Sequence, residues 1–458
     1  MSHRTIICRL GATDTTTIQP SQADSVVTTI DFLDDAGRLK FGLGQTLEQL
    51  AGWGLTPSEI AIDLALLATA LTAADTRISR QAESQDHWTR EIELWVPVAN
   101  PDVWNGQRGL LGQTLRFLTG DHWRLNFRSR PGDRAVLAPA TEQLRMISPT
   151  SVCLLSGGLD SFVGAIDLLC DDQTPLFVSH WWDTIAAKHQ SYCMTQLQAR
   201  FTPRQLNHLR ANVGFDHHTV TSSGVEDTLR GRSFLFFALA AVAASALDGD
   251  MVVHVPENGL ISLNVPLDPL RLGALSTRTT HPFYVARFNE LLHNLGLPIR
   301  LDNRYRHRTK GQMVAECRDP AFLRQHAKHT MSCSGPSKYR FHVDEAMRKP
   351  QHCGHCVPCL IRRASLLRGL GTDSTPYTLD NLRARVIDSG RAEGEHIRAF
   401  QLALMRLATK PTRARLDIHQ PGPLFDHPGD LANYEAVYVE GMREVAQLLD
   451  GVQAKPLT

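Results

Sequence analysis

The sequence predicts an α/β fold, with a doubly wound parallel sheet at the centre of the chain. From Ser151 onward, short apolar segments typical of strands alternate with segments of helical periodicity, and this alternation is typical of parallel sheets with helices on both faces. The stretch 154–162, Leu-Leu-Ser-Gly-Gly-Leu-Asp-Ser-Phe, joins the first such strand to the first such helix. Three cysteines within residues 353–359 indicate a metal subsite beside this core.

The composition is that of a soluble globular protein with two or three domains. The chain has 458 residues, of which 42% are hydrophobic, and a formal net charge of +1. This charge gives no argument for a nucleic-acid or membrane partner. No run of about eighteen apolar residues occurs, so we expect no membrane span. The N-terminus lacks a signal-peptide pattern, and nine cysteines do not make a disulfide scaffold in so long a chain. We therefore expect a cytoplasmic protein with reduced thiols.

Residues 1–148 are predicted to form a separate α+β domain, in which we find no catalytic constellation. One helix is expected over Pro57–Ala73, with Thr56 as its N-cap and Pro57 at its first position. We interpret this region as an accessory or docking domain, connected to the next domain by residues 131–149. The predicted strands, which are apolar or alternating segments, are Thr5–Leu10, Val26–Phe32, Glu91–Val98 and Trp123–Arg128.

The central domain, residues 149–372, carries the predicted parallel sheet. Ligands of such sheets bind at the carboxyl ends of the strands. Ser179 and His180 end the second strand, and residues 256–259 follow the fourth, so we expect them to line one site with the loop. The predicted strands are Val152–Leu155, Pro175–Trp181, His217–Thr221 and Met251–Val255. The predicted helices run from the loop to Leu169, over Ala186–Phe201 and over Arg232–Leu247.

Residues 373–458 are predicted to form a helical C-terminal extension. Residues 411–428 are rich in proline and are expected to be irregular. Helices are predicted over Leu379–Ile387, Glu393–Leu407 and Leu431–Leu449, the last of them amphipathic.

The loop after the first strand has the chemistry of an anion site. Gly157 and Gly158 allow the backbone to approach a ligand closely, and free N–H groups at a helix start favour an anion. Ser156 and Ser161 add hydroxyl donors. Asp160 is unusual in a phosphate cradle, unless it orders the loop or approaches a metal ion. The alternative interpretation is a plain turn.

The cysteine cluster predicts a structural zinc site. Cys353, Cys356 and Cys359 are separated by two residues each, and Cys333 supplies a fourth thiol. Four thiolates suit tetrahedral Zn²⁺, and all-cysteine sites are usually structural. His352 is a possible substitute if Cys333 is too distant. The alternatives are a redox pair and unconnected buried cysteines.

The loop and the cysteines together resemble a known enzyme family. The pattern S-G-G-x-D-S is similar to the pyrophosphate loop of N-type ATP pyrophosphatases, and the chain resembles the QueC family, the 7-cyano-7-deazaguanine synthases. The segments that carry this resemblance, in family order, are 156–161, 231–241, 309–314, and 329–333 with 353–359. Ser233 and Gln312 depart from the usual Asn and Glu, and 276–282 stands where the family has an Asp-Cys-Arg segment near its substrate. The resemblance implies the adenine-nucleotide alpha-hydrolase (HUP/PP-loop) fold.

The added flanking regions resemble the layout of the QueC-like component of Qat antiphage defence operons, or its relative in some CBASS operons. The resemblance implies an ATP-dependent C–N ligase that forms AMP and pyrophosphate. It would adenylate the carboxylate of 7-carboxy-7-deazaguanine and transfer the acyl group to an amine, which would belong to a partner protein of the same operon. The implied cofactors are ATP, Mg²⁺ and Zn²⁺. Two alternatives stay open, a nitrile (preQ0) synthase that uses ammonia and a non-catalytic nucleotide-binding scaffold.

The resemblance also implies roles for particular residues. Arg232 and Lys310 are candidates to stabilise phosphate charge, and Asp160 and Ser161 complete the predicted catalytic set. The alternative roles are a helix-start ion pair for Arg232 and a solvated surface charge for Lys310. The residues expected to hold the nucleotide are Leu155, Ser156, Gly157, Gly158, Leu159, Asp160, Ser161, Phe162, Ser179 and His180. The acceptor amine, the partner and the oligomeric state are not specified by the sequence.

Overall fold

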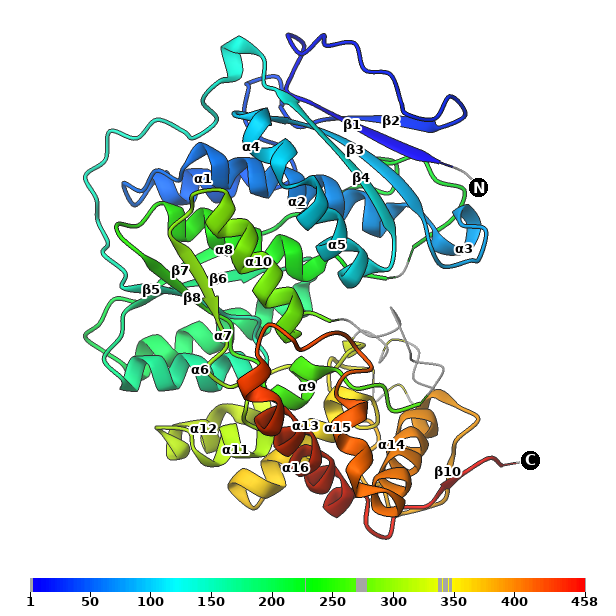
Figure 1. Cartoon of the computed structure of the whole chain (residues 1–458). Helices are drawn as coiled ribbons and strands as arrows, with labels where there is room; N and C mark the ends of the chain where they lie inside the picture. Colours follow the sequence, from blue (N-terminus) through cyan, green and yellow to red (C-terminus); the bar gives the residue numbers. More distant parts are fainter. Residues whose placement is uncertain are drawn as a thin grey trace.

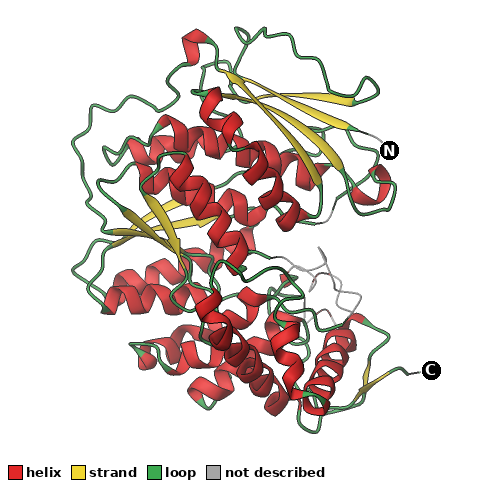
Figure 2. Ribbon diagram, in the orientation of Figure 1, coloured by secondary structure: helices red, strands yellow, loops and turns green. Residues whose placement is uncertain are grey.

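The computed structural model describes residues 3–226, 228–268, 278–336, 340, 345 and 348–457. Within these ranges the chain forms two larger parallel sheets with helices packed between and below them. From top to bottom of Figure 1, the N-terminal sheet is followed by two layers of helices, the central sheet, the helices α6 and α7, and the C-terminal helices. Figure 2 shows that helices dominate the lower half of the molecule.

The N-terminal sheet is parallel throughout, so the expected α+β class of this region is wrong. Among the described residues its order is β2-β1-β3-β4, and each neighbouring pair runs parallel. Parallel neighbours need a crossover, commonly a helix, and helices stand between β2 and β3 and between β3 and β4. The elements are β1 (Arg4–Arg9), β2 (Val26–Asp31), α1 (Leu43–Ala51), α2 (Glu59–Arg77), α3 (Arg80–Glu83), β3 (Glu91–Val98), α4 (Pro101–Gly106), α5 (Arg108–Thr119) and β4 (His122–Ser129).

Helix α2 begins two residues later than the sequence indicates. Its N-cap is Ser58, not Thr56, because the Ser58 side chain accepts a hydrogen bond from the backbone N–H of Ala61. Pro57 therefore precedes the cap. Almost every residue from Ala61 to Asp75 is buried, since α2 packs against the N-terminal sheet on one side and α8 (Arg232–Ser245) on the other.

The predicted parallel sheet of the central region is confirmed. Its strand order among the described residues is β7-β6-β5-β8-β9, and all pairs are parallel. The strands are β5 (Ser151–Leu154), β6 (Pro175–His180), β7 (Asn207–Ala211), β8 (Met251–His254) and β9 (Ile299–Asp302). The predicted strand His217–Thr221 is wrong: this segment is turn and irregular chain, and β7 lies earlier. Strand β9 was not predicted.

The two faces of the central sheet belong to different cores. Val152 and Leu154 of β5 share a core with α8 and the N-terminal region, whereas Cys153 and Leu155 pack with α6 (Leu159–Cys170). This alternation is the two-residue period of a strand buried on both faces. Helix α10 (Pro282–Asn294) joins α8 on the first face, and α7 (Thr184–Arg200) joins α6 on the second.

The N-terminal region also covers the β7 edge of the central sheet. Gln49 of α1 donates from Nε2 to the carbonyl of His208 at 3.0 Å, and its Oε1 accepts from the N–H of Arg210 at 3.1 Å. The amide side chain thus satisfies backbone groups that an edge strand leaves open.

The C-terminal helices confirm part of the prediction. Helix α16 (Leu431–Leu449) has the predicted bounds, and α14 (Ala392–Thr409) contains the predicted 393–407. The predicted helix Leu379–Ile387 is wrong, since this stretch is turns followed by β10 (Ile387–Asp388), which pairs with β11 (Ala454–Lys455). The remaining helices are α9 (Gly259–Leu263), α11 (Lys310–Ala315), α12 (Pro320–His326), α13 (Val357–Leu370) and α15 (Ala414–Asp417). No helix within the described ranges has the length and apolar character needed to cross a bilayer.

Candidate functional site

The loop between β5 and α6 is a tight turn that leads directly into a helix N-terminus. Gly157 has φ 81°, and a Cβ there would lie 2.9 Å from the backbone nitrogen of Gln190. Only glycine fits both the left-handed backbone and the close approach of α7. Gly158 is the N-cap of α6, with no side-chain cap. The N–H groups of Gly158 and Leu159 make only long contacts, 3.3 Å to Ser156 Oγ and 3.4 Å to Ser332 Oγ, and the hydroxyls of Ser156 and Ser161 lie 3.1 Å apart.

This loop opens into a cavity of about 480 Å³, here named the loop cavity. The volume is in the usual range of small-ligand sites. The cavity lies where the strand order reverses between β5 and β8, the position at which open parallel sheets bind ligands. Its lining combines the loop with residues that follow β8 and with residues near the cysteines, and includes Ser156, Gly158, Asp160, Trp182, Arg232, Glu257, Lys310 and Ser332.

A buried group of charges lies at the start of α6. Lys310 Nζ is 3.1 Å from Asp160 Oδ1, and Asn258 Nδ2 donates to Asp160 Oδ2 at 2.7 Å. Although burial opposes it, the Lys310 charge holds the pKa of Asp160 below its usual range. Burial and the neighbouring Asp160 carboxylate raise the pKa of Glu257 well above its usual range. The two carboxyl groups are thus shifted in opposite directions, which favours the charged form of Asp160 and the protonated form of Glu257. Lys310 is only 4% exposed, so it is not a solvated surface charge.

Arg232, the first residue of α8, faces the loop cavity without an ion pair among the described residues. Its guanidinium lies over the Trp182 ring, 3.3 Å from the ring centroid. Burial lowers the pKa of Arg232 to about 9. A cation that is desolvated and held only by an aromatic face is suited to bind an anion.

Ser179 and His180 are both predicted to contact the nucleotide, but only His180 lines a cavity among those described. Ser179 is fully buried, and its hydroxyl donates to the carbonyl of Leu155 and contacts His208 Nε2. His180 lines a second cavity of about 270 Å³ that adjoins the loop cavity at Trp182 and Arg232. Burial lowers the pKa of His180 to about 4, so it is neutral. Ser179 thus supports the loop from behind. Leu155 and Phe162 likewise have buried side chains.

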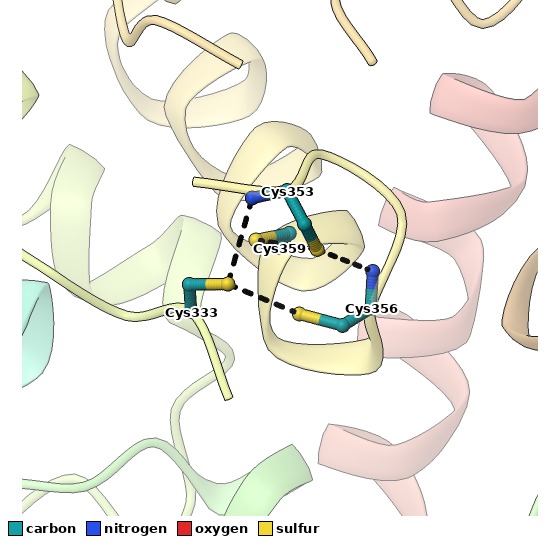
Figure 3. Close-up of side chains that lie close together, drawn as sticks. All are labelled: Cys333, Cys353, Cys356 and Cys359. Atoms are coloured by element: carbon teal, nitrogen blue, oxygen red, sulfur yellow. Dashed lines mark hydrogen bonds between the residues drawn. The ribbon is translucent and has the colours of Figure 1, made fainter. Parts of the chain in front are cut away.

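The four predicted metal ligands come together. Cys333, Cys353, Cys356 and Cys359 have sulfur atoms that all lie within 4.8 Å of one another, and Figure 3 shows the side chains converging from the 333 segment and the start of α13. Two sulfur pairs, Cys333–Cys356 and Cys353–Cys359, are 3.9 Å apart. A tetrahedron with Zn–S bonds of about 2.3 Å requires a separation of about 3.8 Å. The donor set and the spacing fit zinc, and His352 is not needed as a substitute.

The cysteine cluster is joined to the loop between β5 and α6 by a short segment. Ser332, next to Cys333, has its hydroxyl 3.4 Å from the backbone nitrogen of Leu159, and Met331 N–H donates to the carbonyl of Gly157 at 2.8 Å. Arg362 of α13, fully buried, donates to Thr330 Oγ1 and to the carbonyl of Ala327. The metal subsite therefore braces one wall of the loop cavity.

Both flanking regions also support the site. Asp75 of α2 accepts a hydrogen bond from the N–H of Gly231 at 2.7 Å, directly before Arg232. Glu444 of α16 accepts from Thr309 Oγ1 and from the N–H of Gly311 at 3.2 Å, on either side of Lys310. A Cβ on either glycine would collide with a neighbour, Leu71 at Gly231 and Glu444 at Gly311. Each flank thus fixes the backbone beside one cation.

Several of these residues were outside the predicted site. Trp182, Ser332, Glu444 and Arg362 carry no spacing signal, and Arg362 is one of three arginines in α13. Of the segment 276–282, Ser276 and Thr277 lie outside the described residues. Arg278 donates to the carbonyl of Phe117 at 2.8 Å.

A scan against family models and searches of curated proteins and of solved structures give no match to this chain.

Proposed function

We propose that the chain is an ATP-dependent ligase that activates the carboxylate of a 7-deazaguanine and transfers the acyl group to an amine. The observation that supports this most is the loop cavity, in which the start of α6, the Ser156 hydroxyl, Arg232 and Lys310 face one space. Such a set of N–H donors and cations suits a leaving pyrophosphate. The metal subsite beside it matches the predicted combination of loop and cysteines.

In this proposal the residues act mainly by positioning and electrostatics. A carboxylate oxygen attacks the α-phosphorus of ATP and the bond to pyrophosphate breaks; Gly158, Leu159 and Ser156 hold the departing anion by N–H and O–H donors. Arg232 stabilises the charge that builds on the phosphate oxygens. The amine then attacks the acyl carbon, AMP leaves with the bonding electrons, and the amine loses one proton.

The chain offers few ligands to Mg²⁺ in this cavity. Asp160 faces the cavity but already contacts Lys310 and Asn258. Mg²⁺ usually takes one or two carboxylates and relies on substrate phosphates and water for the rest, so Asp160 is the residue that would hold it. We assign the adenosine to the second cavity, the one of about 270 Å³ that is lined by neutral His180 and the Trp182 ring.

The proposal is tested by product analysis. The purified protein is incubated with ATP and 7-carboxy-7-deazaguanine, alone, with ammonia and with proteins encoded beside it, and AMP, pyrophosphate and intact protein masses are measured. We expect AMP and pyrophosphate, and a mass increase on a protein. Free nitrile would instead identify an ammonia-using synthase.

A matched pair of variants checks that the loop is responsible. Ser156→Ala should lower pyrophosphate release at least tenfold because a hydroxyl that faces the loop cavity is lost, whereas Ser374→Ala, at an exposed serine, should not change it. Absence of AMP under every condition contradicts the proposal and favours a non-catalytic scaffold.

A further inference from the structure

A smaller cavity adjoins the loop cavity over the carboxyl ends of β5 and β8. It has a volume of about 190 Å³ and shares Ser156, Arg232 and Glu257 with the loop cavity. We name it the β8 arm. Its other lining residues are Leu154, Ser161, Ser233, Phe236, Phe237, Val255, Pro256, Thr279 and Thr280. The arm therefore has apolar and aromatic walls and leads directly to the loop.

Two hydroxyls in this lining have unused hydrogen-bonding capacity. Ser233 is 5% exposed and Thr280 is 6% exposed. Within the described part of the chain, neither Ser233 Oγ nor Thr280 Oγ1 has a hydrogen-bond partner of good geometry; the Tyr284 hydroxyl interacts with Ser233 but also lacks a partner of good geometry. Buried hydroxyls of folded proteins are nearly always satisfied, so two of them in the same cavity indicate polar atoms of a ligand.

Glu257 adds a third polar group at the junction of the arm with the loop cavity. Burial and the neighbouring Asp160 carboxylate raise its pKa, and a protonated carboxyl both donates and accepts hydrogen bonds. Flat apolar walls with a few convergent donors and acceptors are typical of sites for neutral heterocycles. An aliphatic ligand would leave the hydroxyls unsatisfied, and a charged one would find no opposite charge deep in the arm.

We propose that the β8 arm binds a neutral, flat heterocycle of purine size, with Ser233 and Thr280 hydrogen-bonded to its edge. Its substituent, here the carboxylate, points toward Arg232 and the loop. This assignment rests on the proposed function for the identity of the base. It names Ser233 and Thr280 as residues that determine substrate specificity.

The test measures binding rather than turnover. Titration calorimetry with 7-carboxy-7-deazaguanine, and separately with ATP, is carried out on the full chain, on Thr280→Val and on Ser233→Ala. Each variant should bind the base about tenfold more weakly, the effect of one lost hydrogen bond, and should bind ATP as before. The thermal midpoint should stay the same or rise because an unsatisfied hydroxyl is removed.

Thr69→Val is the matched control. Thr69 of α2 is also a fully buried threonine without a partner, but it does not line the arm, so base binding should not change. Unaltered base affinity in both arm variants, or no binding by the wild-type chain, overturns the assignment. A lower midpoint with unchanged base binding also overturns it, since the hydroxyls are then structural. Base binding without AMP formation contradicts the ligase proposal and leaves the arm assignment standing.

Discussion

The N-terminal region and the C-terminal helices perform the same task at the site by different means. Each places one buried carboxylate beside one cation of the loop cavity, Asp75 beside Arg232 and Glu444 beside Lys310. Asp75 is also paired with Arg80 and Arg90. Glu444 instead accepts hydrogen bonds from neutral groups of the Thr309–Gly311 turn.

The difference concerns how the carboxylate charge is compensated. Arg80 and Arg90 bridge Asp75 and Asp121 with distances of 2.7–3.0 Å, and all four side chains are at most 5% exposed. This network pairs two cations with two anions. At Glu444, burial and the Glu440 charge raise the pKa of the carboxyl, against the effect of its hydrogen bonds and of Arg368. The N-terminal support should therefore be stable across pH, and the C-terminal support should respond to it.

The largest effect on the loop is expected from disrupting the cysteine cluster, a support on the C-terminal side of the site. Chelation of the metal, or Cys356→Ser, should loosen the first turn of α13 and the segment 330–333, because metal binding supplies folding free energy. Hydrogen exchange should then accelerate at 330–333 and at the start of α6. Cys170→Ser, at an exposed free cysteine, is the control. Unchanged exchange at the α6 start would show that the cluster does not brace the loop.

A smaller effect is expected from Asp75→Ala. It leaves Arg80 and Arg90 with one buried carboxylate between them, and breaking a buried pair costs about 3–5 kcal/mol. The free energy of unfolding, from urea titration, measures it. Asp248→Ala removes the 90% exposed partner of Arg145 and should cost at most about 1 kcal/mol. Equal losses in the two variants would mean that the buried network is not a support.

The smallest effect, and the one that separates the two supports, is the pH dependence at Glu444. Its pKa is raised in the folded state, so its contribution to stability is present at low pH and is lost as pH rises through that raised value. A carboxyl whose pKa is higher by one in the folded chain than in the unfolded chain loses about 1.4 kcal/mol in this way. Urea midpoints between pH 4.5 and 8 should fall less with pH in Glu444→Gln than in the wild-type chain. A parallel decline in both would refute the assignment.

The sequence predicted best those parts of the molecule in which local pattern and tertiary burial agree. The Gly-rich turn, the apolar α8 and the amphipathic α16 are examples, and the cysteine spacing predicted a cluster that the structure contains. Strand β7 was not predicted because the sequence Asn-His-Leu-Arg-Ala has little strand character. Its extended conformation depends on pairing with β6 and on the hydrogen bonds from Gln49. The segment 217–221 has better local propensity but no partner strand.

The supporting carboxylates could not be predicted for a related reason. Asp75 and Gly231 are 156 positions apart in the chain, and Glu444 and Gly311 are 133 apart. A motif records short spacings, whereas these contacts depend on how α2 and α16 pack against the centre. The N-terminal class was misjudged because α4 and α5, which connect β3 to β4, were not recognised in the sequence.

The Gln49 contact with β7 has a consequence for how the chain avoids aggregation. A strand at the rim of a sheet offers unpaired amides and carbonyls to any other chain, and pairing of this kind starts the growth of insoluble assemblies. Here one glutamine from the first helix occupies two of those groups at residues 208 and 210. The N-terminal region therefore shields the β7 edge of the central sheet from other chains. A chain shortened to residues 149–458 would expose this edge to pairing with a second copy.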